Sequence, residues 1–157
     1  MKVLLVVDMQ KGFMVSDKYV SLSDKIRNLI NKSNYDKVIF TKFVNTKSQN
    51  SFYIDKIGWT GLLSIEEQDF SFELPENSVV FEKYGYGLAS GAMEYLKSLD
   101  IHEIDVCGVK SEACVYAISL QLWDNHIFPN ILVNFVEGDI DMQNIYIKQF
   151  GKIDNRS

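Results

Sequence analysis

The sequence has little of what identifies several classes of protein. Its two cysteines, Cys107 and Cys114, make no disulfide framework, and we expect both to be free thiols. No run of Lys or Arg is long enough for a nucleic-acid or anionic-membrane footprint, and the net charge is -5. No apolar run approaches the roughly 20 residues that cross a membrane. The composition therefore predicts neither a nucleic-acid partner nor a membrane partner.

The first apolar run is also too short for a signal peptide. Val3–Val7 ends on Asp8, and no small-residue cleavage site follows. This predicts a cytoplasmic protein. The length, without repeats or low-complexity stretches, favours one domain spanning residues 1–157. With 46% hydrophobic and 24% charged residues, the composition is that of a globular protein.

Strand-like and helix-like segments alternate along the chain, which is typical of an α/β protein whose parallel sheet is covered on both faces. Strands, apolar at nearly every position, are expected at Lys2–Val7, Lys37–Phe43, Ser78–Phe81, Glu103–Val109 and Asn130–Phe135. Helices, with apolar residues at helical spacing, are expected at Ser21–Lys32, Ser90–Leu99, Ser111–Asp124 and about Asp141–Phe150. The segment Asn45–Pro75 is aromatic and lacks clear periodicity, which indicates a functional loop or lid.

Three residues that can carry chemistry follow the ends of expected strands. Asp8 closes the first strand, Lys83 follows the third, and Cys114 lies just beyond the fourth. The carboxyl ends of parallel strands share one edge of a sheet, so we expect the three side chains to converge there. Taken singly, they could be a turn-capping aspartate, a surface lysine paired with Glu82, and a small buried cysteine. The last explanation is the one we keep for Cys107.

The position of Cys114 favours a nucleophile. Ser111 is the expected N-cap of a helix, and this places Cys114 in the first turn of that helix. Unpaired backbone N–H groups in a first turn favour a thiolate and can hold an oxyanion. A lysine close to both a carboxylate and a thiol would stabilise the thiolate and orient the acid, which is the role we expect of Lys83.

Several segments, in order along the chain, resemble the motifs of one family. Val6–Phe13 is similar to an opening strand that ends on a catalytic aspartate. Trp59–Gly61, Glu73–Pro75 and Ser78–Lys83 are similar to a central stretch that ends on a catalytic lysine, and Val106–Val115 is similar to a nucleophile motif. The family is that of the isochorismatase-like cysteine hydrolases, which includes the nicotinamidases. The resemblance covers roughly residues 1–136.

The resemblance implies a fold and a set of catalytic groups. The fold is a three-layer, doubly wound, Rossmann-like α/β arrangement, with a mostly parallel sheet and helices on both faces. The implied catalytic triad is Asp8, Lys83 and Cys114. The resemblance further implies a cis peptide bond between Val109 and Lys110, and an oxyanion hole formed by the backbone N–H groups of Lys110 and Cys114.

The implied function is hydrolysis of a small-molecule amide through a thioester on Cys114. Phe13, Trp59, Tyr84 and Tyr86 are the expected walls of a pocket for a small flat or apolar substrate. Nicotinamidases carry a metal site of Asp and His residues after the second strand, but residues 41–52 contain no histidine. We therefore expect no metal and no cofactor. Isochorismatase activity itself needs no thiol nucleophile, so the presence of a cysteine favours acyl chemistry.

Two other functions remain open. The first is a catalytically silent binding or interaction protein with the same fold. Lys110 favours it, because this lysine replaces the small residue usual in the family, and so does a tail after Phe135 that is short for the family. The intact triad opposes it. The second is a flavodoxin-like nucleotide binder, which shares the alternation of strands and helices but needs a Gly-rich phosphate loop that is missing after Val7. The family resemblance also implies a homodimer or a larger homo-oligomer.

Overall fold

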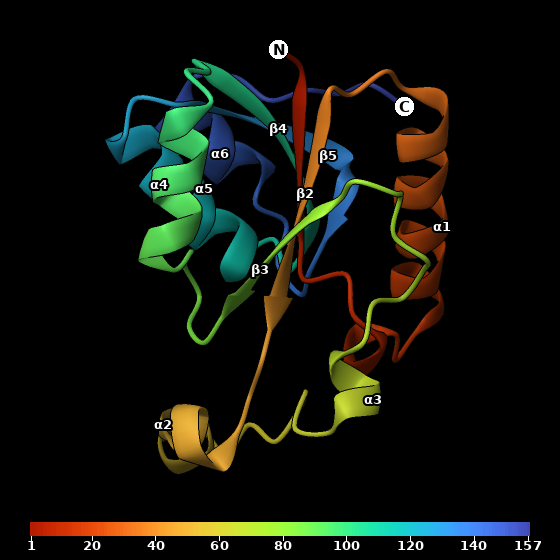
Figure 1. Ribbon diagram of the computed structural model, residues 1–157, viewed down its shortest axis with the longest axis vertical. Helices are drawn as coiled ribbons and strands as arrows, with labels where there is room; N and C mark the ends of the chain where they lie inside the picture. Colours follow the sequence, from red (N-terminus) through yellow and green to blue (C-terminus); the bar gives the residue numbers. More distant parts are fainter.

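A sheet of five parallel strands forms the centre of the computed structural model (Figure 1). The structure describes the backbone of residues 1–157 and the side chains of residues 1–46 and 51–157. The strands lie in the order β3-β2-β1-β4-β5, and each adjacent pair is parallel. Their bounds are β1 Val3–Val7, β2 Lys37–Phe43, β3 Val79–Lys83, β4 Glu103–Val109 and β5 Phe128–Glu137. The expected parallel sheet is confirmed.

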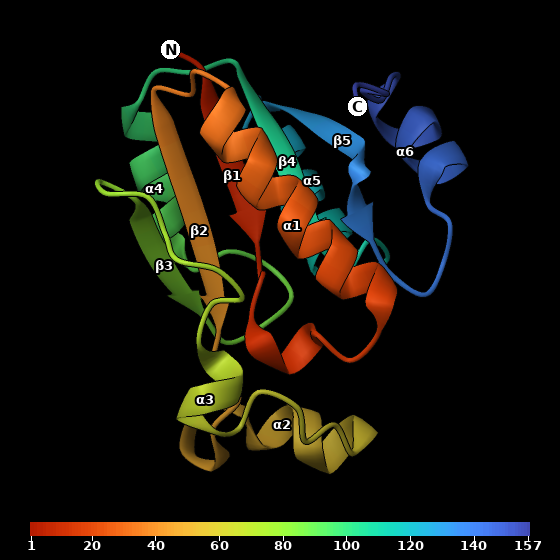
Figure 2. The ribbon, with the colours of Figure 1, turned by 90° about the vertical axis from the view of Figure 1, so that its right-hand side faces the viewer.

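Helices cover both faces of this sheet, which gives the expected three layers (Figures 1 and 2). On one face lies α1 (Asp17–Lys32), and on the other lie α4 (Ser90–Ser98), α5 (Cys114–Asp124) and α6 (Gln143–Phe150). The chain winds outward from β1 in both directions, as in doubly wound folds. Within the part of the chain that the structure describes, no helix is both long and apolar enough to cross a bilayer.

The central strand β1 is apolar at every position because both of its faces are buried. Val3, Leu5 and Val7 pack into the core beneath α4, α5 and α6. Leu4 and Val6 point to the other face and pack into the core beneath α1. Both faces of the strand are therefore buried, and alternate side chains serve opposite layers.

The segment between β2 and β3 extends beyond the carboxyl ends of the strands (Figure 2). It contains α2 (Lys47–Ile57) and the single turn α3 (Ile65–Gln68). In α2, Tyr53 is 9% exposed, whereas its neighbour Phe52 is 66% exposed and Ile57 is 63% exposed. Apolar residues thus lie on more than one side of this helix, which explains why the sequence showed no clear periodicity there.

The structure corrects several element boundaries. The first helix begins at Asp17, four residues before the expected Ser21, because its first turn buries Tyr19 alone and so adds no apolar periodicity. The strand β3 continues to Lys83 instead of ending at Phe81. The helix α5 begins at Cys114, so the expectation that Ser111 caps it was wrong.

Candidate active site

Three residues predicted from the ends of strands meet at the carboxyl edge of the sheet. Asp8 follows β1 directly, Lys83 is the last residue of β3, and Cys114 is the first residue of α5. The Lys83 Nζ atom lies 3.0 Å from Asp8 Oδ2 and 3.2 Å from Cys114 Sγ. The parallel register that pairs Phe43 of β2 with Lys83 brings the lysine to the level of the other two residues. The expected convergence of these side chains is present.

The orientation of Asp8 depends on a residue that the sequence did not single out, Thr41 of β2. The Asp8 N–H donates to Thr41 Oγ1 at 3.1 Å, and the threonine hydroxyl donates to Asp8 Oδ1 at 2.6 Å. Asp8 has a left-handed backbone with φ 51, a conformation that aspartate tolerates better than most residues. The carboxylate is thereby turned so that Oδ2 faces Lys83.

Lys83 is buried, with its ammonium surrounded by acceptors. Besides its contacts with Asp8 and Cys114, Nζ donates to the carbonyl oxygen of Gly85 at 2.7 Å and lies 3.3 Å from that of Tyr86. Burial lowers the pKa of Lys83, but Asp8 and Cys114 outweigh that effect and leave the pKa above its ordinary value. The lysine is therefore a cation at neutral pH.

The buried thiol of Cys114 has a raised pKa. Burial and the charge of Asp8 raise the pKa and Lys83 opposes both, which leaves it at about 12. The start of the helix was expected to favour a thiolate, whereas burial and the charge of Asp8 disfavour one. The Lys83 ammonium contacts both the sulfur and the Asp8 carboxylate, and so it links the thiol to a nearby proton acceptor.

The backbone that precedes Cys114 contains the cis peptide bond that the family resemblance implied. The peptide bond between Val109 and Lys110 is cis. The N–H groups of Ala113 and Val115 donate to the carbonyl of Lys110 at 3.1 and 3.2 Å. Among the hydrogen bonds of the described residues, none uses the N–H of Lys110 or of Cys114. These two N–H groups are the ones that the resemblance assigns to an oxyanion hole.

A pocket of about 180 Å³ opens onto Cys114. Its lining residues are Phe13, Phe43, Tyr53, Ile57, Trp59, Tyr86, Lys110, Glu112, Ala113, Cys114 and Asp139. Three of the four expected wall residues, Phe13, Trp59 and Tyr86, are among them. Tyr84 instead lines a neighbouring hollow, because its hydroxyl donates to Glu82 at 2.9 Å on the exposed side.

The walls of this pocket differ from one side to the other. The aromatic side is a packed cluster, in which the ring of Phe43 lies 5.4 Å, centroid to centroid, from the rings of both Tyr53 and Trp59. The opposite side is charged, and there Lys110 Nζ lies 3.1 Å from Asp139 Oδ2. Tyr53 and Asp139 were missed from the sequence, because neither lies in a recognisable motif.

The side chains near the site do not fit a metal ion. Among the side chains that the structure describes, no group of three or more His, Cys, Asp or Glu residues is arranged to hold one. At the end of β2, Phe43 presents its ring to the Lys83 ammonium at 4.6 Å. Asn45 uses its side-chain NH₂ group on the carbonyls of Trp59 and Gly61, at 3.3 and 2.9 Å. We therefore assign no catalytic step to a metal.

Comparison with known proteins finds one matching family and several solved structures. The isochorismatase domain model matches residues 2–131. N-carbamoylsarcosine amidase from Thermoplasma acidophilum superposes with a TM-score of 0.82 at 18% identity, covering 99% of this chain and 96% of that chain. No curated protein matches the sequence significantly.

Two further solved structures share the fold. The pyrazinamidase of Pyrococcus horikoshii, solved in complex with zinc, has a TM-score of 0.74 at 20% identity and covers 96% of this chain and 94% of that chain. The nicotinamidase of Staphylococcus aureus has a TM-score of 0.76 at 15% identity and covers 99% and 98%. At these identities the similarity establishes the fold alone.

Proposed function

Since the chain belongs to the isochorismatase family, we propose that it is a cysteine hydrolase that cleaves the C–N bond of a small-molecule amide. The observation that carries this proposal is the position of the Lys83 ammonium, 3.0 Å from Asp8 and 3.2 Å from Cys114, the residue onto which the pocket opens. A cation in contact with both a carboxylate base and a thiol is an arrangement suited to thiol activation.

The first half of the proposed reaction acylates Cys114. Asp8 takes the thiol proton, and the sulfur attacks the carbonyl carbon of the amide. The negative charge that develops on the carbonyl oxygen is held by the backbone N–H groups of Lys110 and Cys114. Asp8 then gives its proton to the leaving nitrogen, the C–N bond breaks, and a thioester and a free amine or ammonia result.

The second half of the reaction restores the enzyme. A water molecule gives a proton to Asp8 and attacks the thioester carbonyl. The C–S bond breaks, the carboxylic acid leaves, and the sulfur takes the proton back from Asp8. Throughout, Lys83 keeps a positive charge beside whichever of the two neighbouring groups is anionic. This role agrees with its raised pKa.

The pocket indicates what kind of amide fits. At about 180 Å³ it is smaller than the roughly 300 Å³ at which sites for drug-sized ligands begin. The aromatic side formed by Phe13, Trp59 and Tyr86 suits a flat or apolar group. The similarity in fold to a nicotinamidase and to an N-carbamoylsarcosine amidase supports testing aromatic amides and N-carbamoyl compounds first.

A binding protein without turnover is the second candidate. One observation favours it: the Lys110–Asp139 ion pair stands at the pocket wall. Such a protein would retain the pocket and bind a small amide, but it would release no ammonia.

The test is ammonia release from a panel of small amides that includes nicotinamide and N-carbamoylsarcosine. Wild type is compared with Cys114→Ala and with Cys107→Ala, which removes the other thiol away from the pocket. We expect release by wild type and Cys107→Ala and none by Cys114→Ala. Release that persists in Cys114→Ala contradicts the nucleophile. Binding of an amide without release by any of the three favours the binding protein.

A further inference from the structure

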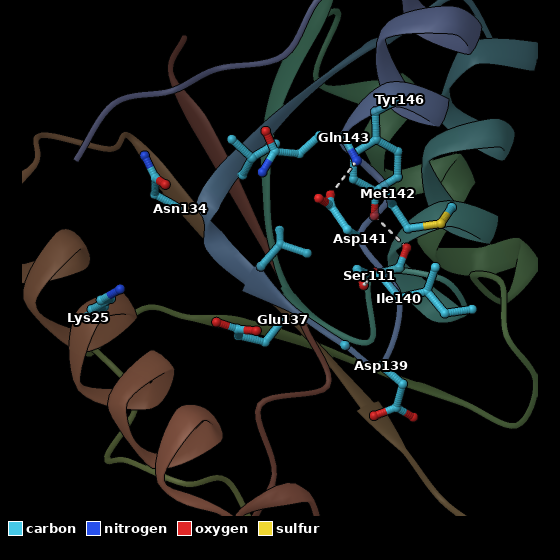
Figure 3. Close-up of a pocket in the computed structure, with 13 residues that line it drawn as sticks. Lys25, Ser111, Asn134, Glu137, Asp139, Ile140, Asp141, Met142, Gln143 and Tyr146 are labelled. Carbon is cyan, nitrogen blue, oxygen red and sulfur yellow. Dashed lines mark hydrogen bonds between the residues drawn. The ribbon is translucent and has the colours of Figure 1, made fainter.

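Two loops pack against each other behind the nucleophile. The nucleophile loop, Lys110–Ala113, joins β4 to α5, and the β5–α6 loop covers Gly138–Met142. The Ser111 N–H donates to the carbonyl of Glu137 at 2.9 Å, and the hydroxyl of Tyr146 donates to the carbonyl of Ser111. Figure 3 shows Tyr146 of α6 directed toward Ser111. The last part of the chain thus holds the loop that precedes the cysteine.

Glu112 is the side chain that ties these two loops together. The N–H of Asp139 lies 3.2 Å from Glu112 Oε1 and 3.1 Å from Oε2, a shared bond to both oxygens. The Ser111 hydroxyl donates to Oε2 at 2.9 Å. All the hydrogen bonds described for this carboxylate go to donors of the two loops. Glu112 lines the pocket, yet its carboxylate is engaged in holding backbone in place.

The contact leaves no room for a side chain at Gly138. A Cβ atom there would lie 2.1 Å from Glu112 Oε2 and 2.2 Å from Ser111 Oγ. The β5–α6 loop can approach the nucleophile loop this closely only because residue 138 is a glycine.

The same contact fixes the charged wall of the pocket. Asp139, held through its N–H by Glu112, accepts a hydrogen bond from Lys110 Nζ at 3.1 Å, and this bond lowers the pKa of the aspartate. The hydroxyl of Tyr19 donates to its other oxygen at 3.3 Å. Asp139 lines both the catalytic pocket and a hollow of about 410 Å³ behind the loops (Figure 3). It is therefore part of the partition between them.

We propose that Glu112 is a positioning residue, whose carboxylate clamps Asp139 to the nucleophile loop and so sets the direction of the Lys110 backbone N–H and side chain. The inference rests on the proposed amide hydrolysis. Glu112 does not touch the reacting atoms in this role. It acts through Asp139 and Lys110, and its effect is felt where the oxyanion forms.

The test compares Glu112→Ala, Glu112→Gln and the control Glu137→Gln in the full chain. Gln keeps one oxygen that can accept from Asp139 N–H, so it partly rescues the clamp. Glu137→Gln removes a nearby carboxylate but keeps the backbone carbonyl that holds Ser111. The measurements are kcat and KM for the amide found in the panel, and hydrogen–deuterium exchange of peptides that cover residues 138–142 and the sheet.

For Glu112→Ala we expect kcat to fall by about 10- to 100-fold with KM within about threefold, because an oxyanion donor acts mainly in the transition state. Exchange in residues 138–142 should accelerate while exchange in the sheet stays as in wild type. Glu112→Gln should be intermediate in both measurements, and Glu137→Gln unchanged. If Glu112→Ala does not fold, Glu112→Gln is compared with Glu137→Gln, and the proposal is judged by the same changes in kcat, KM and exchange.

Three results overturn the clamp: unchanged exchange in residues 138–142, faster exchange with wild-type kcat, or a change in KM alone. If wild type shows no Cys114-dependent release from any amide, the proposed function fails separately. The proposed role of Glu112 is then tested by two measurements on Glu112→Ala: hydrogen–deuterium exchange in residues 138–142 and the rate at which iodoacetamide alkylates Cys114. Faster exchange together with an alkylation rate that differs from wild type supports the role, and any other combination contradicts it.

Discussion

The ammonium nitrogen of Lys83 lies 3.2 Å from the sulfur of Cys114, although the two residues are 31 positions apart in the chain. The same nitrogen lies 3.0 Å from Asp8 Oδ2, so one cation faces both partners of the proposed proton transfer. Moving a proton from sulfur to carboxylate shifts negative charge from one neighbour of the lysine to the other. The site can therefore form a thiolate inside a buried setting without leaving an anion unpaired.

Iodoacetamide should distinguish the two cysteines. Cys114 lines the pocket and contacts the Lys83 ammonium, whereas Cys107 is fully buried in the sheet, where burial raises its pKa. We expect alkylation at Cys114 at least about tenfold faster at neutral pH, since a thiolate and access are both required. Mass spectrometry of peptides measures the two rates, with Cys107→Ala as control. Equal rates would argue against an activated Cys114.

Asp8→Asn should separate ionisation of the thiol from turnover. The charge of Asp8 raises the pKa of Cys114, so its removal lowers that pKa and leaves Lys83 to stabilise the thiolate. The pH midpoint of alkylation should move down, while amide hydrolysis falls by about 10²- to 10⁴-fold because the proton acceptor is lost. A midpoint that moves up would contradict the assigned charges.

Lys83→Met should destabilise the wild-type protein more than it destabilises the Asp8→Asn variant. Removing one member of a buried ion pair leaves the other charge unpaired and costs about 3–5 kcal/mol in free energy of unfolding. The double variant Asp8→Asn, Lys83→Met should recover a large part of that loss. Urea unfolding of the two single variants and the double variant measures the coupling. Additive losses would show that the pair contributes nothing as a pair.

Gly108→Ala should disrupt the contact between β1 and β4. Gly108 has φ +118, and a Cβ there would lie 2.2 Å from the carbonyl oxygen of Val7. We expect a loss of about 3 kcal/mol or more in free energy of unfolding, from backbone strain and overlap together. The matched control is Gly91→Ala in α4, where a Cβ meets nothing within 4 Å. It should be neutral or stabilise by up to about 1 kcal/mol, because alanine favours helix. Similar losses in both variants would contradict this reading.

Asp154→Asn should weaken the fold at neutral pH and have less effect in acid. Hydrogen bonds from Arg156 and Asn130 hold the pKa of Asp154 below its usual range. A depressed carboxyl pKa contributes stability above the unfolded pKa of about 4, and this stability is lost as pH falls below it. We expect a loss of about 1–2 kcal/mol at pH 7 that shrinks below about pH 4. Chemical unfolding of wild type and Asp154→Asn across this pH range measures the difference in stability. A difference that grows in acid would contradict the lowered pKa of Asp154.

Much of the fold could be predicted because its strands follow a strong local rule. Strands buried on both faces are apolar throughout, and Val3–Val7 is the clearest example. The meeting of Asp8, Lys83 and Cys114 followed from one further rule, that parallel strands end at the same edge. Both rules need only the order of residues along the chain.

Features that depend on contacts between distant segments could not be predicted in this way. Ser111 looked like a helix cap, but its hydroxyl is used by Glu112 and lies 3.0 Å from the carbonyl of Ile140. Thr41 orients Asp8 only because the register of β1 and β2 places it there. The raised pKa of Cys114 depends on how deeply the finished fold buries the sulfur.

The order of the strands has a consequence for refolding. Lys83 lies on the edge strand β3, and β2 and β1 separate that strand from β4, which leads into Cys114. A partly assembled sheet that lacks either β3 or β4 has no complete site, whatever helix content it has regained. Recovery of enzymatic rate should therefore lag behind recovery of circular dichroism after dilution from denaturant, because non-local strand pairing is the slow event. The catalytic centre would then serve as a reporter of the last long-range contact to form.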